Sequence, residues 1–176
     1  MFMVSLARLC GVAEAGRGPW AGPVTAAAVI LDPDNPITGL NDSKKITEKK
    51  RLDMEIEIKA SALAWSIGWA SEKEIDMLNI REATFLAMKR AIDGLTIAPD
   101  EIIVDGNALP AGLPAPSRAL VQGDSLVPAI SAASILAKTA RDRLMVELCE
   151  TYPGYGFAKH KGYGTQAHSQ ALTTLG

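Results

Sequence analysis

Short apolar segments that end at glycine, proline or acidic residues constrain the fold of this chain more than any other feature. Val24–Leu31 is apolar at almost every position and is followed by Pro33 and Pro36, a pattern typical of a strand inside a sheet. Leu9–Glu14 and Glu101–Val104 are shorter runs of the same kind. These runs predict three strands, and two further strands are expected at Ala64–Ala70 and Ala119–Val121.

Helical patterns separate the later strands. Thr47 is a suitable N-cap for a helix over 48–63, because its hydroxyl can accept a hydrogen bond from a free backbone N–H. On that helix Leu52, Ile56 and the stem of Lys59 recur at helical spacing. We therefore expect these three side chains to share one face of the helix.

Four more helices are expected along the chain, the last of them a short helix after Thr165. Ser71 and Glu74 have the spacing of a capping box at the start of a short helix. Ile80–Leu95 is amphipathic, and Val127–Glu150 is a long, largely apolar helix that ends before Pro153. This order of elements predicts an α/β fold with a mixed five-stranded sheet flanked by helices, in which crossover connections are parallel and right-handed.

Length and charge limit what the chain can be. Its 176 residues suit a single domain over 1–176 with one large core. The net charge of −2 gives no overall positive field that would attract nucleic acid. Any nucleic-acid contact must therefore come from local basic clusters, at 44–51 and 159–161, for which solvated surface charge is the alternative interpretation.

Cysteine content and hydropathy point to the cytoplasm. Cys10 and Cys149 are far apart in the sequence and match no zinc-binding or redox spacing, so we expect buried, reduced thiols. The apolar start of the chain is too short for a signal peptide. No apolar run reaches the ~18 residues that a membrane span requires.

Three acidic residues occupy positions where acids are unexpected. Glu14 and Asp105 each end an apolar strand, and Asp142 lies within the long helix. If the first and fourth strands are neighbours, Glu14 and Asp105 meet at one edge of the sheet, where ligands gather in α/β proteins. Carboxylates in one cleft repel each other unless a divalent cation neutralises them, and oxygen ligands favour Mg²⁺ or Mn²⁺.

Each acid also has a purely structural interpretation. Asp105 alone could close a turn after its strand, and Glu14 could bond its own turn. Asp142 could form an ion pair with Lys138, one helical turn earlier. The turn that follows Glu14, Gly16-Arg17-Gly18, argues for function, because glycine lets the backbone approach a ligand closely beside a fixed cation.

Six motifs occur in an order that resembles one known family. The resemblance is to bacterial ribonuclease HII, the type 2 ribonuclease H family, and it covers nearly the whole chain. The motifs are Cys10–Pro19, Leu40–Lys45, Glu74–Ile80, Val104–Asn107, Ala132–Asp142 and Tyr155–His168.

The resemblance implies an RNase H-like fold and a site of four carboxylates that holds two Mg²⁺ or Mn²⁺ ions. The corresponding positions are 13, Glu14, Asp105 and Asp142, but the family has an aspartate where this chain has Ala13. We therefore expect a metal-dependent endoribonuclease, leaving 5′-phosphate and 3′-hydroxyl ends, that is impaired or inactive in this form. Family members usually continue beyond the position of Gly176, so we also expect a missing C-terminal segment.

By the same resemblance, the substrate is the RNA strand of RNA–DNA hybrids, or a ribonucleotide embedded in duplex DNA. A 2′-hydroxyl is the group that distinguishes RNA from DNA at such a site. Tyr163 would stack on the neighbouring deoxyribose, and we expect the chain to act as a monomer. The expected substrate-binding residues are Gly16, Arg17, Gly18, Asn41, Ser43, Lys44, Asn107 and Tyr163.

Two other functions remain open at this point. Ala13 would also suit a module that binds RNA–DNA junctions without cutting them. A DNA nuclease or transposase could use the same fold, although the Gly-Arg-Gly and Gly-Tyr-Gly segments suit recognition of a 2′-hydroxyl better. A P-loop nucleotide site is excluded, because the chain has no matching glycine-lysine motif.

Overall fold

A mixed five-stranded sheet forms the centre of the protein. The structure, a computed structural model, describes residues 8–16, 22–40 and 46–151, with side chains as far as residue 148. The strand order is β3-β2-β1-β4-β5, in which β1 is antiparallel to β2 and parallel to β4. The first and fourth strands are therefore neighbours, which is the condition under which Glu14 and Asp105 meet at one edge. The strands are β1 (Leu9–Ala15), β2 (Val24–Ile30), β3 (Ala64–Ala70), β4 (Glu101–Asp105) and β5 (Ser117–Leu120).

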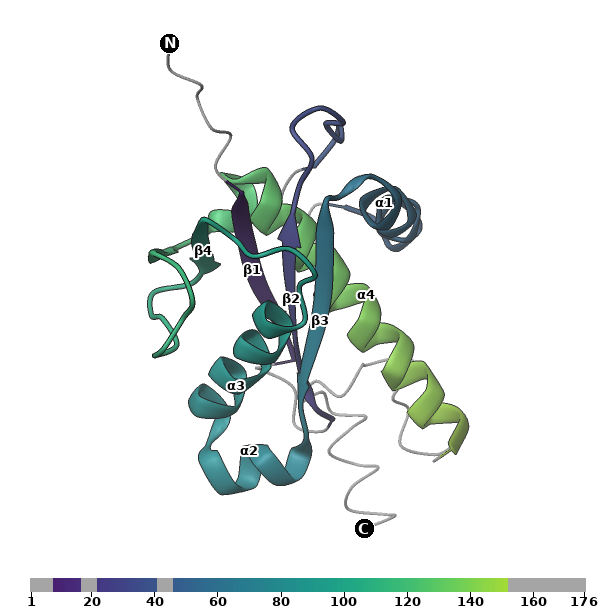
Figure 1. The fold of residues 1–176 in the computed structure, drawn as a ribbon. Coiled ribbons are helices and arrows are strands. Elements are labelled where there is room, and N and C mark those ends of the chain that lie inside the picture. Colours follow the sequence, from purple (N-terminus) through teal and green to yellow (C-terminus); the bar gives the residue numbers. More distant parts are fainter. Residues whose placement is uncertain (1–7, 17–21, 41–45, 152–176) are drawn as a thin grey trace.

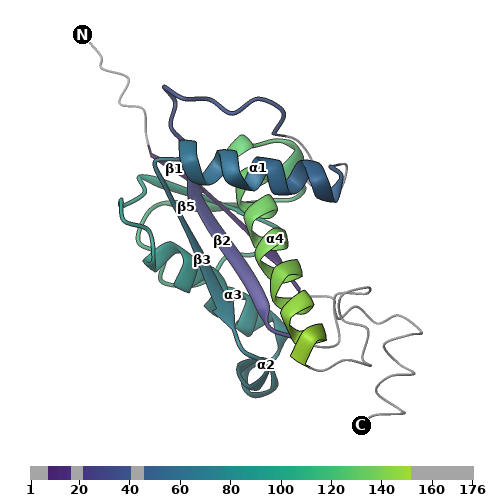
Figure 2. The ribbon, with the colours of Figure 1, turned by 90° about the vertical axis from the view of Figure 1, so that its right-hand side faces the viewer.

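Helices cover both faces of this sheet. Figure 1 shows α2 and α3 on one side and α4 on the other, and the rotated view in Figure 2 shows α1 crossing near the upper end of α4. Both predicted N-caps are present: Thr47 accepts from the Lys50 N–H, and Ser71 forms a capping box with Glu74. The helical elements are α1 (Glu48–Ser61), α2 (Glu72–Leu78), α3 (Ile80–Asp93), the short 3-10 turn η2 (Gly123–Ser125) and α4 (Pro128–Thr151).

Alternate residues of the central strands divide the core into two layers. Val12 of β1 and Val104 of β4 pack in the layer beneath α3. Ala13 and Ile103, their immediate neighbours in the chain, pack in the layer beneath α1 and α4. Even-numbered residues of β1 and β4 therefore lie on the side of α3, and odd-numbered residues lie on the side of α1 and α4.

Small residues allow α4 to lie directly against β1. A Cβ atom at Gly11 would collide with the backbone of Ala129 and Ile130 at the start of α4. A Cβ atom at Gly16, just beyond the other end of β1, would collide with the side chain of Arg141. The helix consequently runs alongside β1 in the same direction, and its later turns reach the carboxyl end of that strand.

The face of α1 that carries Leu52 and Ile56 is not the face that packs against the sheet. Leu52 and Ile56 are exposed, by 43% and 69%, whereas Met54 and Ile58 are buried against the sheet. Glu55 is also buried, at 5% exposure, and forms an ion pair with Arg143 of α4. This ion pair with Arg143 places Glu55 on the buried side of α1, together with Met54 and Ile58.

Cys10 is fully buried in β1, as expected. Burial raises the pKa of its thiol to about 12, so the group stays protonated and unreactive at neutral pH. The side chain of Cys149 lies outside the described residues. A search of the described helices finds none both long and apolar enough to cross a bilayer.

Thr25 of β2 provides a test of the packing beneath α4. Its hydroxyl is fully buried and has no hydrogen-bond partner among the described residues. We expect Thr25→Val to raise the free energy of unfolding by about 1 kcal/mol, because an unsatisfied buried hydroxyl is removed without a change of shape. Chemical denaturation of both proteins measures the difference.

Thr84→Val is the matched control. Thr84 is equally inaccessible, but its hydroxyl donates to the carbonyl oxygen of Ile80 at 2.6 Å. This variant should lose stability or remain unchanged. Equal effects of the two substitutions would contradict the assignment of Thr25 as unsatisfied.

Candidate active site at the carboxyl edge of the sheet

Glu14 and Asp105 line one pocket at the carboxyl ends of β1 and β4. The two strands are parallel and Val12 pairs with Val104, so both strands end at the same edge. The pocket has a volume of about 180 Å³, and Asn107 contributes to its wall. The structure thus brings together the two acids that the sequence analysis placed at one edge. Its other lining residues are Arg81, Thr84, Phe85, Met88, Gly106 and Ala108.

The two acids approach this pocket from different sides of the sheet. Glu14 follows Val12 at a spacing of two and continues the row of side chains beneath α3. Asp105 follows Ile103 in the same way and continues the row beneath α4. The backbone N–H of Gly123, in η2, donates to Asp105 Oδ1 at 3.0 Å and holds that carboxylate in place.

Ala13 lies on the α4 side of β1 and is 1% exposed. Because Val12 pairs with Val104, the next residue of each strand brings Ala13 beside Asp105. A carboxylate at position 13 would therefore point to the same side of the sheet as Asp105. This is the position at which the family resemblance implies an aspartate.

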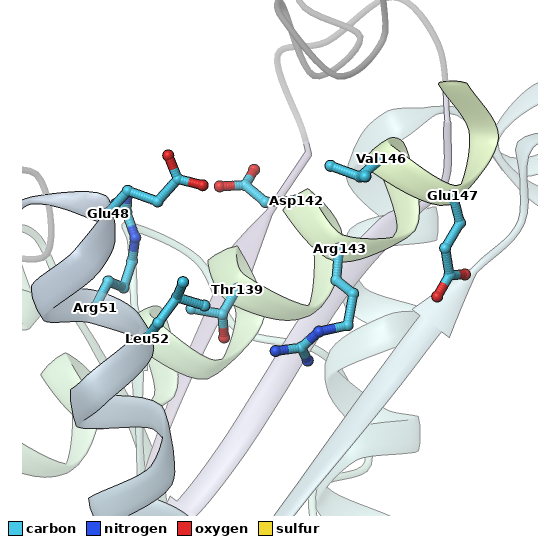
Figure 3. A pocket seen from close by; sticks show the side chains of 8 residues that line it. All are labelled: Glu48, Arg51, Leu52, Thr139, Asp142, Arg143, Val146 and Glu147. Carbon is cyan, nitrogen blue, oxygen red and sulfur yellow. The ribbon is translucent and has the colours of Figure 1, made fainter. Parts of the chain in front are cut away.

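Asp142 reaches the same end of the sheet from α4, but it lines a different pocket. Its neighbour in the chain, Arg141, lies against Gly16 at the end of β1. The side chain of Asp142 is 15% exposed and lies 3.5 Å from Lys138 Nζ, so the ion pair considered as an alternative is present. Figure 3 shows Asp142 and Glu48 of α1 pointing toward each other across this second pocket, whose volume is about 210 Å³.

The donor set suits a hard divalent cation but is divided between two pockets. Glu14 and Asp105 offer only carboxylate oxygens, which Mg²⁺ and Mn²⁺ prefer. Within the part of the chain that the structure describes, no three Asp, Glu, His or Cys side chains approach closely enough to hold a metal. A carboxylate at position 13 would add a donor on the side of β1 that α4 covers.

Glu55 fixes α1 against the part of α4 that carries Asp142. Its carboxylate oxygens lie 2.7 and 3.1 Å from the guanidinium nitrogens of Arg143, 3.1 Å from Thr139 Oγ1 and 3.3 Å from Lys59 Nζ. The hydrogen bonds from Arg143 lower the pKa of Glu55, and burial opposes that shift. The same contact raises the pKa of Arg143.

The remaining predicted binding residues divide into two groups. Gly16 is buried with a φ of +94°, so only glycine suits its backbone, and Asn107 is exposed at the pocket rim. The others lie outside the described residues: Arg17, Gly18, Asn41, Ser43, Lys44 and Tyr163.

Two charged residues near the acids were not singled out from the sequence. Arg81 lines the pocket of Glu14 and Asp105, where its cation could contact a phosphate. Glu48 faces Asp142. Arg81 could have been considered from its place in the first turn of the amphipathic helix, whereas no local signal connects Glu48 with α4.

Comparisons with known proteins identify close relatives. A family model described as Ribonuclease HII matches residues 10–176. Ribonuclease HII of Hyphomonas neptunium is 59% identical over 182 residues, covering 96% of this chain and 88% of the relative. Ribonuclease HII of Acinetobacter baylyi is 61% identical over 168 residues, covering 96% and 89% respectively. These matches far exceed what a shared fold alone produces.

Several solved structures of ribonucleases H have a fold similar to that of this chain. Ribonuclease H2 from Pyrococcus horikoshii has a TM-score of 0.80 at 29% identity, covering 93% of this chain and 84% of that one. RNase HII from Archaeoglobus fulgidus, solved with PCNA, has a TM-score of 0.77 at 25% identity, covering 96% and 87%. A Bst-RNase HIII chain in complex with Mn²⁺ shares the fold, with a TM-score of 0.70 at 16% identity, covering 97% and 71%. The expected RNase H-like fold is confirmed.

The Glu55 contact predicts a pH-dependent stability. Because the folded-state pKa of Glu55 lies below its ordinary value of 4.5, ionised Glu55 stabilises the fold above that pH, and the contribution is lost as the pH falls through the folded-state pKa. We expect Glu55→Gln to lower the free energy of unfolding by about 1–2 kcal/mol at pH 7, since Arg143 is half exposed and partly screened.

Denaturation of both proteins between pH 7 and pH 3 measures this difference. The gap should begin to narrow near pH 4.5, where Glu55 of the unfolded chain takes up a proton, and should close as the pH falls through the lower folded-state pKa. Glu57→Gln, an exposed position on the same helix, is the control and should change stability little at any pH. A gap that stays constant across the range would contradict the role of the ion pair.

Proposed function

The chain belongs to the ribonuclease HII family, and from this premise we propose that it cleaves RNA–DNA hybrids and incises duplex DNA at embedded ribonucleotides. The observation that supports the proposal most directly is the pocket that Glu14 and Asp105 share at the edge of parallel strands. Asp142 lies on the helix that runs beside β1 and reaches the same end of the sheet. The reaction would be hydrolysis of a phosphodiester bond to 5′-phosphate and 3′-hydroxyl ends.

Four residues around the pocket of Glu14 and Asp105 each have a defined part in the proposed reaction. Glu14 and Asp105 would hold divalent cations, which when bound activate water and stabilise the departing oxygen. The N–H of Gly123 keeps the Asp105 carboxylate oriented, so little reorganisation is needed when a cation binds. Arg81, in the same pocket, would contact a phosphate group of the substrate.

Recognition of the substrate would depend on the segment that follows β1. The turn Gly16-Arg17-Gly18 would bring its backbone close to the 2′-hydroxyl, which tight glycine packing permits. Tyr163 would stack on the next deoxyribose, and Asn41, Ser43 and Lys44 would contact phosphates. Gly16 is the described residue of this set, and its position beside Arg141 supports its part in the proposal.

Ala13 would separate binding from cleavage in this chain. The position is buried beneath α4, where a methyl group packs among apolar side chains instead of presenting a carboxylate. The other acids of the site are present. We therefore propose that this chain binds its substrate and cleaves it slowly. A module that binds junctions without cutting them is the second candidate, and Ala13 is the observation that favours it.

Restoring the acid separates the two candidates. Ala13→Asp should raise the rate of cleavage at a single ribonucleotide in duplex DNA by roughly a hundredfold or more, because a metal-binding carboxylate is worth several kcal/mol in the transition state. Gel analysis of the products with Mg²⁺ or Mn²⁺ measures the rate. Ala13→Asn, which has the same shape without the charge, should not restore cleavage.

An Ala13→Asp form that cuts no faster than the parent would contradict the role of position 13 and favour the binding module. Cleavage by Ala13→Asn at the same rate as by Ala13→Asp would also count against it, because the carboxylate would then be unnecessary.

Thermal unfolding provides an independent test of the same position. Without divalent ions, Ala13→Asp should be less stable than the parent by about 1 kcal/mol, because the new carboxylate is buried beside Asp105. Millimolar Mg²⁺ or Mn²⁺ should stabilise the aspartate form more than the parent, since tighter binding to the native state shifts unfolding further. An aspartate form that is more stable in chelator, or responds equally to metal, would place these side chains in separate sites.

A further inference from the structure

We propose that Arg141 is a positioning residue that ties the end of β1 and the start of β2 to α4, and so sets where Gly16 lies relative to Asp142. The structural part of this inference concerns Gly16, Gly22 and Pro23, all of which are described. The part that concerns substrate selectivity depends on the proposed function.

The burial of Arg141 is the first observation. The residue is 2% exposed and has the largest of the fully buried side chains. A buried guanidinium is costly unless its donors are satisfied, and Arg141 Nε donates to the carbonyl oxygen of Pro23 at 3.2 Å. This contact joins α4 to the residue that directly precedes β2.

Two glycines make room for this side chain. Gly16 and Gly22 have φ angles of +94° and +92°, which favour glycine over other residues. A Cβ atom at Gly16 would lie 2.7 Å from Arg141 Cδ, and one at Gly22 would lie 3.1 Å from Arg141 Nη2. The chain therefore meets the same guanidinium where it leaves β1 and where it approaches β2.

Arg141 and Gly16 are each the immediate neighbour in the chain of a residue of the proposed site. Arg141 immediately precedes Asp142, and Gly16 immediately precedes Arg17. The contact between Arg141 and Gly16 thus connects the start of the recognition turn to an acid of the site through adjacent residues. A shift of Arg141 would move Gly16 relative to Asp142. Discrimination of a ribonucleotide from a deoxyribonucleotide should then suffer before general duplex binding does.

Arg141→Lys tests the proposal, because lysine keeps the charge but cannot reproduce the position of Nε and the planar fork. Fluorescence anisotropy in chelator measures binding to a DNA duplex with one ribonucleotide and to the same duplex without it. We expect the ratio of the two dissociation constants to fall about tenfold, the effect of losing one charge-assisted hydrogen bond. Binding to the all-DNA duplex should change much less.

Hydrogen exchange of the free protein tests the contact without nucleic acid. The peptide spanning 14–24 should exchange faster in Arg141→Lys, while peptides of β3 and α3 stay unchanged. A Cβ atom at Gly22 would crowd Met145 Sδ at 2.8 Å as well as Arg141 Nη2 at 3.1 Å. Gly22→Ala therefore disturbs this packing from the other side while Arg141 itself is kept, and it should show the same pattern if Arg141→Lys folds poorly. Arg90→Lys is the control, because Arg90 also donates to a main-chain oxygen, that of Trp69, at 2.8 Å on the far helix.

The outcomes separate this inference from the proposed function. Unchanged exchange over 14–24 in both Arg141→Lys and Gly22→Ala overturns the positioning role, whatever the binding shows. If Arg141→Lys exchanges faster over 14–24 but keeps the parent's ratio of dissociation constants for the two duplexes, the proposed effect of Arg141 on substrate selectivity is overturned. A parent chain that binds both duplexes equally overturns the proposed function and, with it, the selectivity role, while the exchange result still decides whether Arg141 holds the segment.

Discussion

The close contact between α4 and β1 is the constraint on which the rest of the structure depends. Gly11 lets the start of the helix touch the strand backbone, and Ala13 keeps the space beneath the helix narrow. A larger side chain at Gly11 would push α4 away along its length. Asp142 could then no longer lie at the end of the sheet where Glu14 and Asp105 meet. The geometry of the site therefore depends in part on Gly11, a small residue that packs at the start of α4 and away from the acids.

Local signals were sufficient to predict most elements of the fold. The strands are short apolar runs, and the caps at Thr47 and Ser71 depend on residues three positions away. The face of α1 could not be predicted in this way, because Glu55 is buried by Arg143, a partner from the other end of the chain. Hydropathy treats a glutamate as exposed and cannot anticipate the cation that satisfies it.

The candidate site was predicted in outline rather than in detail. The strand ends indicated that Glu14 and Asp105 would meet if their strands were neighbours, and the parallel pairing of β1 with β4 fulfils that condition. The division of the acids between two pockets depends on strand register and on how α4 is rotated, which residue patterns do not encode. The close packing of Gly16 against Arg141 could not be predicted from the sequence either, although the glycines indicated a turn.

The strand order has a consequence for how the protein folds. β1, β2 and β3 form an antiparallel sheet whose paired residues are at most 46 positions apart (Val24 with Ala70), whereas β4 pairs with β1 across 92 positions (Leu9 with Glu101). Contacts between distant segments form late, because a long stretch of chain must first be ordered. The edge that carries Glu14 and Asp105 lies on this late junction. A nascent chain can thus complete its first three strands on the ribosome before any of the acidic pocket exists.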